Sequence, residues 1–232
     1  MLEALGWGAV AASSLLIGAL LGLVRPWPAR AIGLVLGFGA GALISAVSFE
    51  LAEDGVEIGG GGAVGIGLAA GALVYFVCDS AIERRSGDSD AGAALALGAF
   101  LDGIPEQLVL GLGIALGDGV SAGLLGAIFV SNLPEAIGSA TAMQGAGRER
   151  RGVLVLWAGV ALICTVATGV GFAIADTASD TLQGGLNGFA AGALVVMLVD
   201  SMIPEATRQA GRTTGLVTTL GFAVAAGMSG IG

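Results

Sequence analysis

The chain has 232 residues, of which 55% are hydrophobic, 12% are charged and 43 are Gly, and its formal net charge is -9. Water-soluble globular domains carry about 25% charged residues and about 7% Gly, so this composition excludes that class. The sequence therefore predicts an integral membrane protein.

Long apolar runs divide the chain. Each is close to the roughly 20 residues that a helix needs to cross about 30 Å of hydrocarbon. The runs are continuous, unlike the alternating segments of about 10 residues in outer-membrane barrels. We predict an all-α integral membrane protein with eight transmembrane helices in a single domain over residues 1–232. The predicted spans are 6–25, 32–52, 59–81, 92–116, 120–145, 153–175, 186–207 and 213–231.

The basic residues are all Arg, and they alternate between the connections of the predicted spans. They fall in the first, third, fifth and seventh connections, whereas the other connections have none. Cytoplasmic loops carry the excess of Lys and Arg, so we expect these four connections inside and both termini on the extracytoplasmic side. The nine positions are Arg25, Arg30, Arg84, Arg85, Arg148, Arg150, Arg151, Arg208 and Arg212.

The sequence also contains a candidate internal repeat. Residues 37–43 (GFGAGAL) resemble residues 188–194 (GFAAGAL), an offset of 151 that also carries the first three spans onto the last three. Because three spans are an odd number, the second copy must be inverted. We predict repeat one over 1–85, a central helix pair over 91–146 and inverted repeat two over 152–232. Such a 3+2+3 arrangement is typical of secondary transporters, whose sites lie near the membrane midplane.

The central helix pair contains a second pair of similar motifs, DGIPE in the fourth span and SNLPE in the fifth. A proline inside a helix frees the carbonyl four residues back. A carbonyl freed in hydrocarbon needs a partner, which a cation or a water-lined cavity can supply. The two Pro-Glu steps therefore mark a candidate polar site in the membrane.

Four side chains make up this candidate site. Asp102 and Glu106 share one face of the fourth span, and Ser131 and Glu135 share one face of the fifth. Charged carboxylates are costly in the bilayer, and no Lys or Arg lies near them in the sequence. A divalent cation is the natural occupant. In the alternative interpretation, the prolines are packing kinks and the acids are protonated and hydrogen-bonded between helices.

Further acids mark a candidate cation route. Three lie toward the outer end of the second span, one near the inner end of the third, and two toward the inner end of the seventh. Solvated helix ends are the alternative interpretation. With one amide from the fifth span, the candidate pathway residues are Glu50, Glu53, Asp54, Asp79, Asn132, Asp200 and Glu205.

These motifs resemble those of the ZIP (Zrt/Irt-like protein) family of divalent metal transporters. That family has eight spans, a 3+2+3 inverted repeat, and the motifs His-Asn-x-Pro-Glu and His/Gln-Glu/Asp-x-Pro-His/Glu in its fourth and fifth spans. Residues 200–205 (DSMIPE) are similar to the family's acidic-x-x-Ile-Pro-Glu pattern. The resemblance implies a principal metal site formed by Asp102, in place of a His, with Glu106, Ser131 and Glu135.

The departures from the family concern the metal. The chain has no His. Gly103 stands where the family has Asn and Asn132 where it has an acid, so we expect the family's second site to be lost. Imidazole suits Zn, Cu, Fe and Ni, whereas carboxylate and hydroxyl suit Mg, Ca and Mn. We predict transport of divalent cations across the cytoplasmic membrane, with zinc expected from the resemblance and Mn or Fe(II) as harder candidates.

Other functions stay open. The missing ligands are also compatible with a non-transporting ZIP-like protein that serves as a binding, sensing or scaffold subunit, or with a transporter of another substrate. We expect no enzyme, because the chain has no His or Lys base and neither Cys78 nor Cys164 has an activating group nearby in sequence. The expected partners are the metal cation and the lipid bilayer. We expect no cofactor and no nucleic acid, and a homodimer is an expectation because homodimers are common in the resembled family.

Overall fold

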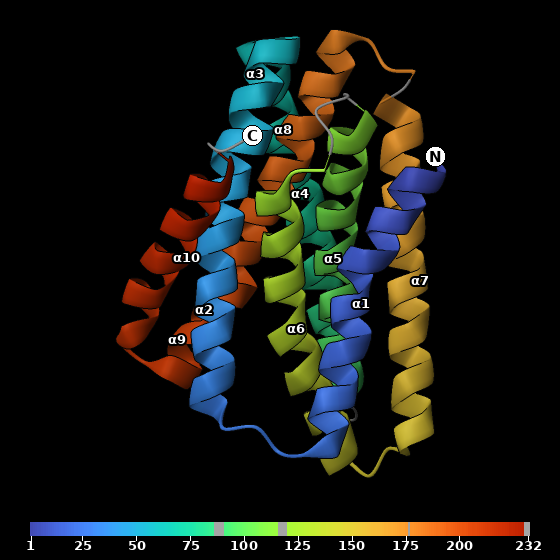
Figure 1. Cartoon of the computed structure of the whole chain (residues 1–232), viewed down its shortest axis with the longest axis vertical. Coiled ribbons are helices and arrows are strands. Elements are labelled where there is room, and N and C mark those ends of the chain that lie inside the picture. Colours follow the sequence, from blue (N-terminus) through green and yellow to red (C-terminus); the bar gives the residue numbers. More distant parts are fainter. Residues whose placement is uncertain (86–90, 116–119, 176, 230–232) are drawn as a thin grey trace.

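A computed structural model describes residues 1–85, 91–115, 120–175 and 177–229, with all side chains except those of residues 82, 83, 85 and 91–102. Throughout the described ranges, the elements are helices, most of them long and packed side by side (Figure 1). Their bounds are α1 Leu2–Val24, α2 Ala29–Ala46, η1 Val47–Glu53, α3 Asp54–Gly59, α4 Gly61–Arg85, α5 Ala91–Ala115, α6 Ala122–Gly145, α7 Arg150–Ala175, α8 Asp180–Met197, η2 Leu198–Met202, α9 Ile203–Ala210 and α10 Thr213–Ser229.

Two of these segments, η1 and η2, are short π-helices that interrupt longer helices. The segments α2, η1 and α3 form one continuous helix, as do α8, η2 and α9, so the described residues form eight helical segments. Five of the helices in the described residues are long and apolar enough to cross a membrane. The prediction of a helical multi-pass membrane protein is confirmed at this level.

The boundaries of two spans were predicted wrongly. The span predicted at 32–52 is a helix from Ala29 to Gly59, and the span predicted at 186–207 runs from Asp180 to Ala210. In both, polar residues outside the apolar run continue the helix. Asp180, for example, lies in the first turn of α8, where the helix dipole favours a negative charge.

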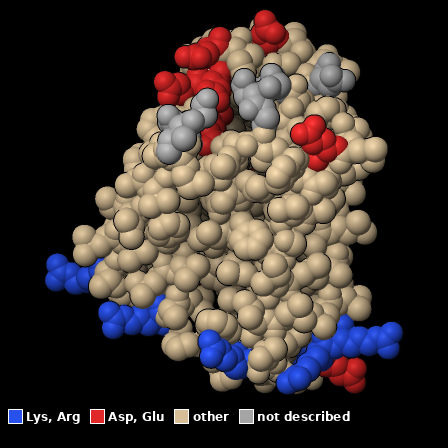
Figure 2. All heavy atoms as spheres, in the orientation of Figure 1, with Lys and Arg blue, Asp and Glu red and all other residues tan. Residues whose placement is uncertain are grey.

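The arginines lie at one end of the bundle. Figure 2 shows blue side chains at its lower end, whereas most of the red acidic surface lies at the upper end. The first residues of α1 and the last turn of α10 lie at the upper end (Figure 1). At the arginine end, the Arg25 guanidinium stacks 4.2 Å from the centre of the Trp27 ring, and the Trp27 indole donates to the Leu21 carbonyl at 3.0 Å. Aromatic and basic side chains of this kind are common at membrane interfaces.

Several structural features recur at an offset of 151 residues. Helices α2 and α8 each have 18 residues, and both continue into a π-helix, which begins at Val47 in one and at Leu198 in the other. The short helices α3 and α9 that follow are capped by Gly60 and Gly211, whose φ angles are +81° and +65°. Glycine is favoured at such positive φ values, which end many helices. Thus one order of helix, π-helix, short helix and glycine turn occurs twice.

The described side chains form two hydrophobic cores, and the central helices contact both. Leu15, Met143 and Trp157 are fully buried in a core formed by α1, α6 and α7. The other core includes Leu43 of α2 and Leu194 of α8. Helices α5 and α6 contact each other, and each also packs against helices of both cores. The Pro-Glu steps are therefore carried by the helices in the middle of the molecule.

Candidate metal centre

Glu106 of α5 and Ser131 of α6 meet in the interior of the bundle. Each is 1% exposed. The Ser131 hydroxyl lies 3.1 Å from Glu106 Oε1 and 3.0 Å from the Ile128 carbonyl oxygen. Because a hydroxyl has one proton, the two acceptors share it. The structure thus brings together two of the four predicted ligands, one from each Pro-Glu motif.

Both central helices continue through their prolines. Pro105 lies inside α5 and Pro134 inside α6, and both are buried. Gly39 of α2 packs on the same part of α6, where a Cβ would lie 2.9 Å from Ser131 Cα. The absence of a side chain at Gly39 lets α2 approach the backbone beside the Glu106–Ser131 pair.

For the other two predicted ligands, Glu135 and Asp102, the structure describes fewer contacts. Glu135 is half-buried on α6 and has an interaction partner. Asp102 belongs to α5, but its side chain lies outside the described residues. Among the described residues, no group of three or more His, Cys, Asp and Glu side chains could hold a metal ion. The four-residue site therefore stays a prediction, of which the Glu106–Ser131 contact is the described part.

Asn132, next to Ser131, is 1% exposed. Its amide nitrogen has no hydrogen-bond partner in the described part of the chain. Burying an amide without a partner costs free energy. Asn132 therefore adds a polar group with unused hydrogen-bonding capacity to this region of α6.

The acids predicted at the outer end of the second span lie on η1 and α3. Glu50 is half-buried on η1, whereas Glu53 and Asp54 are exposed. Helix α3 stands at the end of the bundle opposite the arginines (Figure 1), where Figure 2 shows most of the acidic surface. The sequence did not predict the π-helix that carries Glu50 and Glu53.

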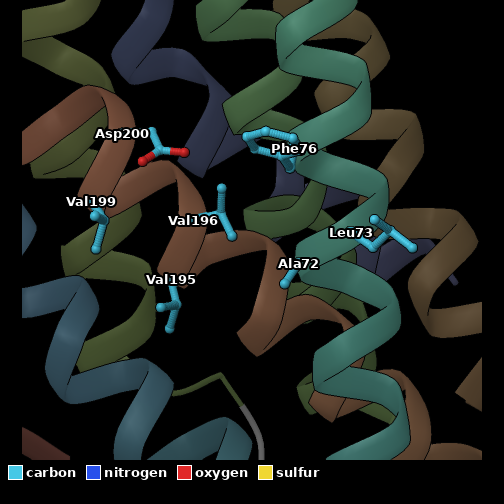
Figure 3. A pocket seen from close by; sticks show the side chains of 7 residues that line it. All are labelled: Ala72, Leu73, Phe76, Val195, Val196, Val199 and Asp200. Atoms are coloured by element: carbon cyan, nitrogen blue, oxygen red, sulfur yellow. The ribbon is translucent and has the colours of Figure 1, made fainter.

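The acids predicted at the inner ends have different surroundings. Asp79 is half-buried on α4 and has a partner. Glu205 accepts hydrogen bonds from Arg208 and Gln209, so an arginine compensates its charge. Asp200 is exposed on η2 and lines a groove of about 470 Å³ between α4 and α8 (Figure 3). The rest of the groove lining is apolar and consists of Ala72, Leu73, Phe76, Val195, Val196 and Val199.

One buried polar contact beside the candidate site was not predicted. Gln107, the residue after Glu106, accepts a hydrogen bond from Thr168 of α7, and both side chains are 0% exposed. The available signal was a Gln within an apolar run, since polar residues inside membrane helices are often functional. Its partner could not be identified without knowing which faces of α5 and α7 meet.

Comparison with known proteins shows a relative among the plant proteins. No family model matches the chain. A curated protein of Arabidopsis thaliana with the name "Putative zinc transporter" is 30% identical over 190 residues, which cover 77% of this chain and 30% of the relative. The chain thus spans about a third of the length of the relative that it matches. Over most of its own length, the chain is similar to a protein that is named as a zinc transporter.

Proposed function

We propose that the chain is a ZIP-like transporter that moves divalent metal cations across the cytoplasmic membrane through a carboxylate site near the membrane midplane. The observation that carries this proposal is the buried Glu106 carboxylate, which accepts a hydrogen bond from Ser131 inside an apolar helix bundle. Similarity to a protein named as a zinc transporter supports the class of substrate.

Asp102, Glu106, Ser131 and Glu135 would bind the cation through oxygen atoms alone. The described arginines are all exposed, so a bound cation would supply the positive charge beside Glu106, which is buried in the middle of the bundle. Oxygen ligands favour hard ions such as Mn²⁺ over zinc, which prefers sites with nitrogen or sulfur. We therefore include zinc, Mn²⁺ and Fe²⁺ among the candidate substrates.

The proposed architecture is an inverted repeat of residues 1–85 and 152–232 around the central helix pair 91–146. Its support is the offset of 151 residues, which relates the bounds of α2 and α8, the starts of η1 and η2, and the glycine turns at Gly60 and Gly211. Since basic residues concentrate in cytoplasmic loops, the arginine end faces the cytoplasm and both termini face outward in this proposal.

The proposed route enters at the acidic end and leaves at the arginine end. Glu50, Glu53 and Asp54 would attract cations on the outer side, and Asp79 and Asp200 would lie on the way out. Glu50, Glu53 and Asp200 are on π-helices. Such segments often occur at functional sites because they interrupt regular helix geometry.

The test is cation flux in proteoliposomes that contain the purified chain, with Zn²⁺, Mn²⁺, Fe²⁺ and Co²⁺ supplied in turn. We expect flux of at least one ion, and loss of that flux in Glu106→Gln. Glu57→Gln is the matched control, because Glu57 is an exposed acid on α3. Absence of flux for every ion, from folded protein, would contradict transport and favour a binding, sensing or scaffold role.

A further inference from the structure

Gln107 and Thr168 form a polar contact at the boundary between α5 and α7. Both side chains are 0% exposed, and the Thr168 hydroxyl donates to Gln107 Oε1. The Gln107 amide nitrogen has no hydrogen-bond partner among the described residues. An amide that is left half-satisfied in the interior destabilises the fold. Its presence beside Glu106 therefore calls for an explanation other than stability.

The contact lies in a boundary where the two helix backbones touch. A Cβ on Gly111 of α5 would overlap the Thr168 carbonyl, and a Cβ on Gly171 of α7 would overlap the Leu108 carbonyl. Helix α1 also packs closely against Thr168, because a Cβ on Gly8 would lie 2.6 Å from Thr168 Oγ1. Small residues let helices approach closely in lipid. Gln107 is thus a large polar side chain held in a narrow, glycine-lined boundary.

Glu106 and Gln107 face two different neighbours. Successive residues of an α-helix lie about 100° apart around its axis, since one turn takes 3.6 residues. Glu106 is bonded to Ser131 of α6, and Gln107 is bonded to Thr168 of α7. Two contacts in different directions on one turn fix the rotation of α5 about its own axis. Pro105, directly before them, removes a backbone hydrogen bond from this turn, so side-chain contacts matter more for its orientation.

We propose that Gln107 is a positioning residue of the cation site: its hydrogen bond with Thr168 fixes the rotation of α5 and so holds the Glu106 carboxylate against Ser131. This inference rests on the proposed function, because Glu106 is there a ligand of the transported cation. Removing a partner that orients a metal ligand commonly lowers metal affinity by about 10–100-fold.

The test measures Zn²⁺ and Mn²⁺ binding to the purified full chain in detergent. Thr168→Val removes the hydroxyl at nearly constant size, and Thr168→Ser keeps it. We expect Thr168→Val to weaken binding by about 10-fold, the lower end of the effect of such orienting partners, and Thr168→Ser to bind like the wild type. Thr165→Val is the matched control, since the Thr165 hydroxyl on the same helix bonds only to the Ala161 carbonyl of its own turn.

A double-mutant cycle separates positioning from a general structural defect. If Thr168 acts through the Glu106–Ser131 contact, Thr168→Val weakens binding less in a Ser131→Ala background than in the wild type. A defect that merely loosens the bundle would give the same loss in both backgrounds and would overturn the inference. Thermal unfolding without metal reports the stability of each variant.

The remaining outcomes are also decisive. Wild-type affinity in folded Thr168→Val overturns the inference while leaving the proposed function in place. If Thr168→Val does not fold, Gln107→Met takes its place with the same measurements and the same criteria. If the wild-type chain binds neither Zn²⁺ nor Mn²⁺ and transports neither, the proposed function itself is wrong and the inference fails with it.

Discussion

Glu106 and Gln107 are successive residues of α5, yet they bond to two different helices, α6 and α7. All four side chains in these contacts are at most 1% exposed. Polar side chains that bond across helices give specific contacts in lipid, where burial of apolar surface does not drive helix association. The turn after Pro105 is therefore held by polar contacts to two neighbouring helices.

Removing the carboxylate of either Glu106 or Glu135, on the two central helices, should abolish cation binding. Glu106→Ala and Glu135→Ala each take away one of three proposed carboxylate ligands, so too few protein oxygens remain to replace the water molecules of the ion's hydration shell. Isothermal titration with Zn²⁺ and Mn²⁺ measures the effect. Glu57→Ala, at an exposed position of α3, should bind like the wild type. Retained binding in Glu106→Ala would contradict the site assignment.

The ion preference should respond to Asp102. Asp102→His introduces an imidazole, which suits zinc better than it suits Mn²⁺. We therefore expect the ratio of zinc to Mn²⁺ affinity to rise, by about 10-fold if the imidazole contributes about 1.4 kcal/mol more to zinc binding than to Mn²⁺ binding. Competition titrations of both ions against wild type and variant give this ratio directly. An unchanged ratio of zinc to Mn²⁺ affinity would show that Asp102 is not a ligand.

The helical spans and the grouping of the arginines could be predicted from the sequence, because hydropathy and charge act locally on each segment. The four-residue spacing within each Pro-Glu motif predicted which polar residues share a helix face. That the faces with Glu106 and Ser131 meet was a condition of the predicted site, and the structure supplies this contact. The π-helices could not be predicted in this way. Pro204 lies two residues after η2 and marks an irregular turn, but η1 contains no proline.

The hydrogen bond between Gln107 and Thr168 could not be predicted from the sequence for a different reason. A sequence shows that Gln107 is polar within an apolar run, but its partner depends on which face of α5 meets α7. That choice is made by the glycines of the boundary, Gly111 and Gly171. The chain contains 43 glycines, and at many of the described ones an added Cβ would meet no atom within 4 Å. Only the packed structure distinguishes the glycines at helix contacts.

The orientation of the bundle can be tested by thiol labelling in intact cells. Glu57→Cys lies on α3, at the end opposite the arginines, and Arg212→Cys lies between α9 and α10. A membrane-impermeant maleimide should label the first variant in intact cells and the second only after lysis. The unsubstituted chain gives the baseline, because Cys78 is exposed on α4. The reverse pattern of labelling would place the termini in the cytoplasm.

Two glycines related by the 151-residue offset should respond alike to substitution. A Cβ on Gly41 of α2 would overlap the Thr218 carbonyl of α10, and a Cβ on Gly192 of α8 would overlap the Leu68 carbonyl of α4. We expect Gly41→Ala and Gly192→Ala each to destabilise the protein by about 1–3 kcal/mol, the usual cost of overpacking. Thermal unfolding in one detergent measures both.

The matched control is Gly65→Ala on α4, where a Cβ would have no neighbour within 4 Å. Alanine is favoured over glycine inside a helix by about 0.5–1 kcal/mol, so this variant should be as stable as the wild type or more stable. If Gly41→Ala behaves like Gly65→Ala, α2 and α10 do not pack as closely as the structure has them. If Gly41→Ala and Gly192→Ala differ strongly, the two halves of the chain do not share the packing that the proposed repeat requires.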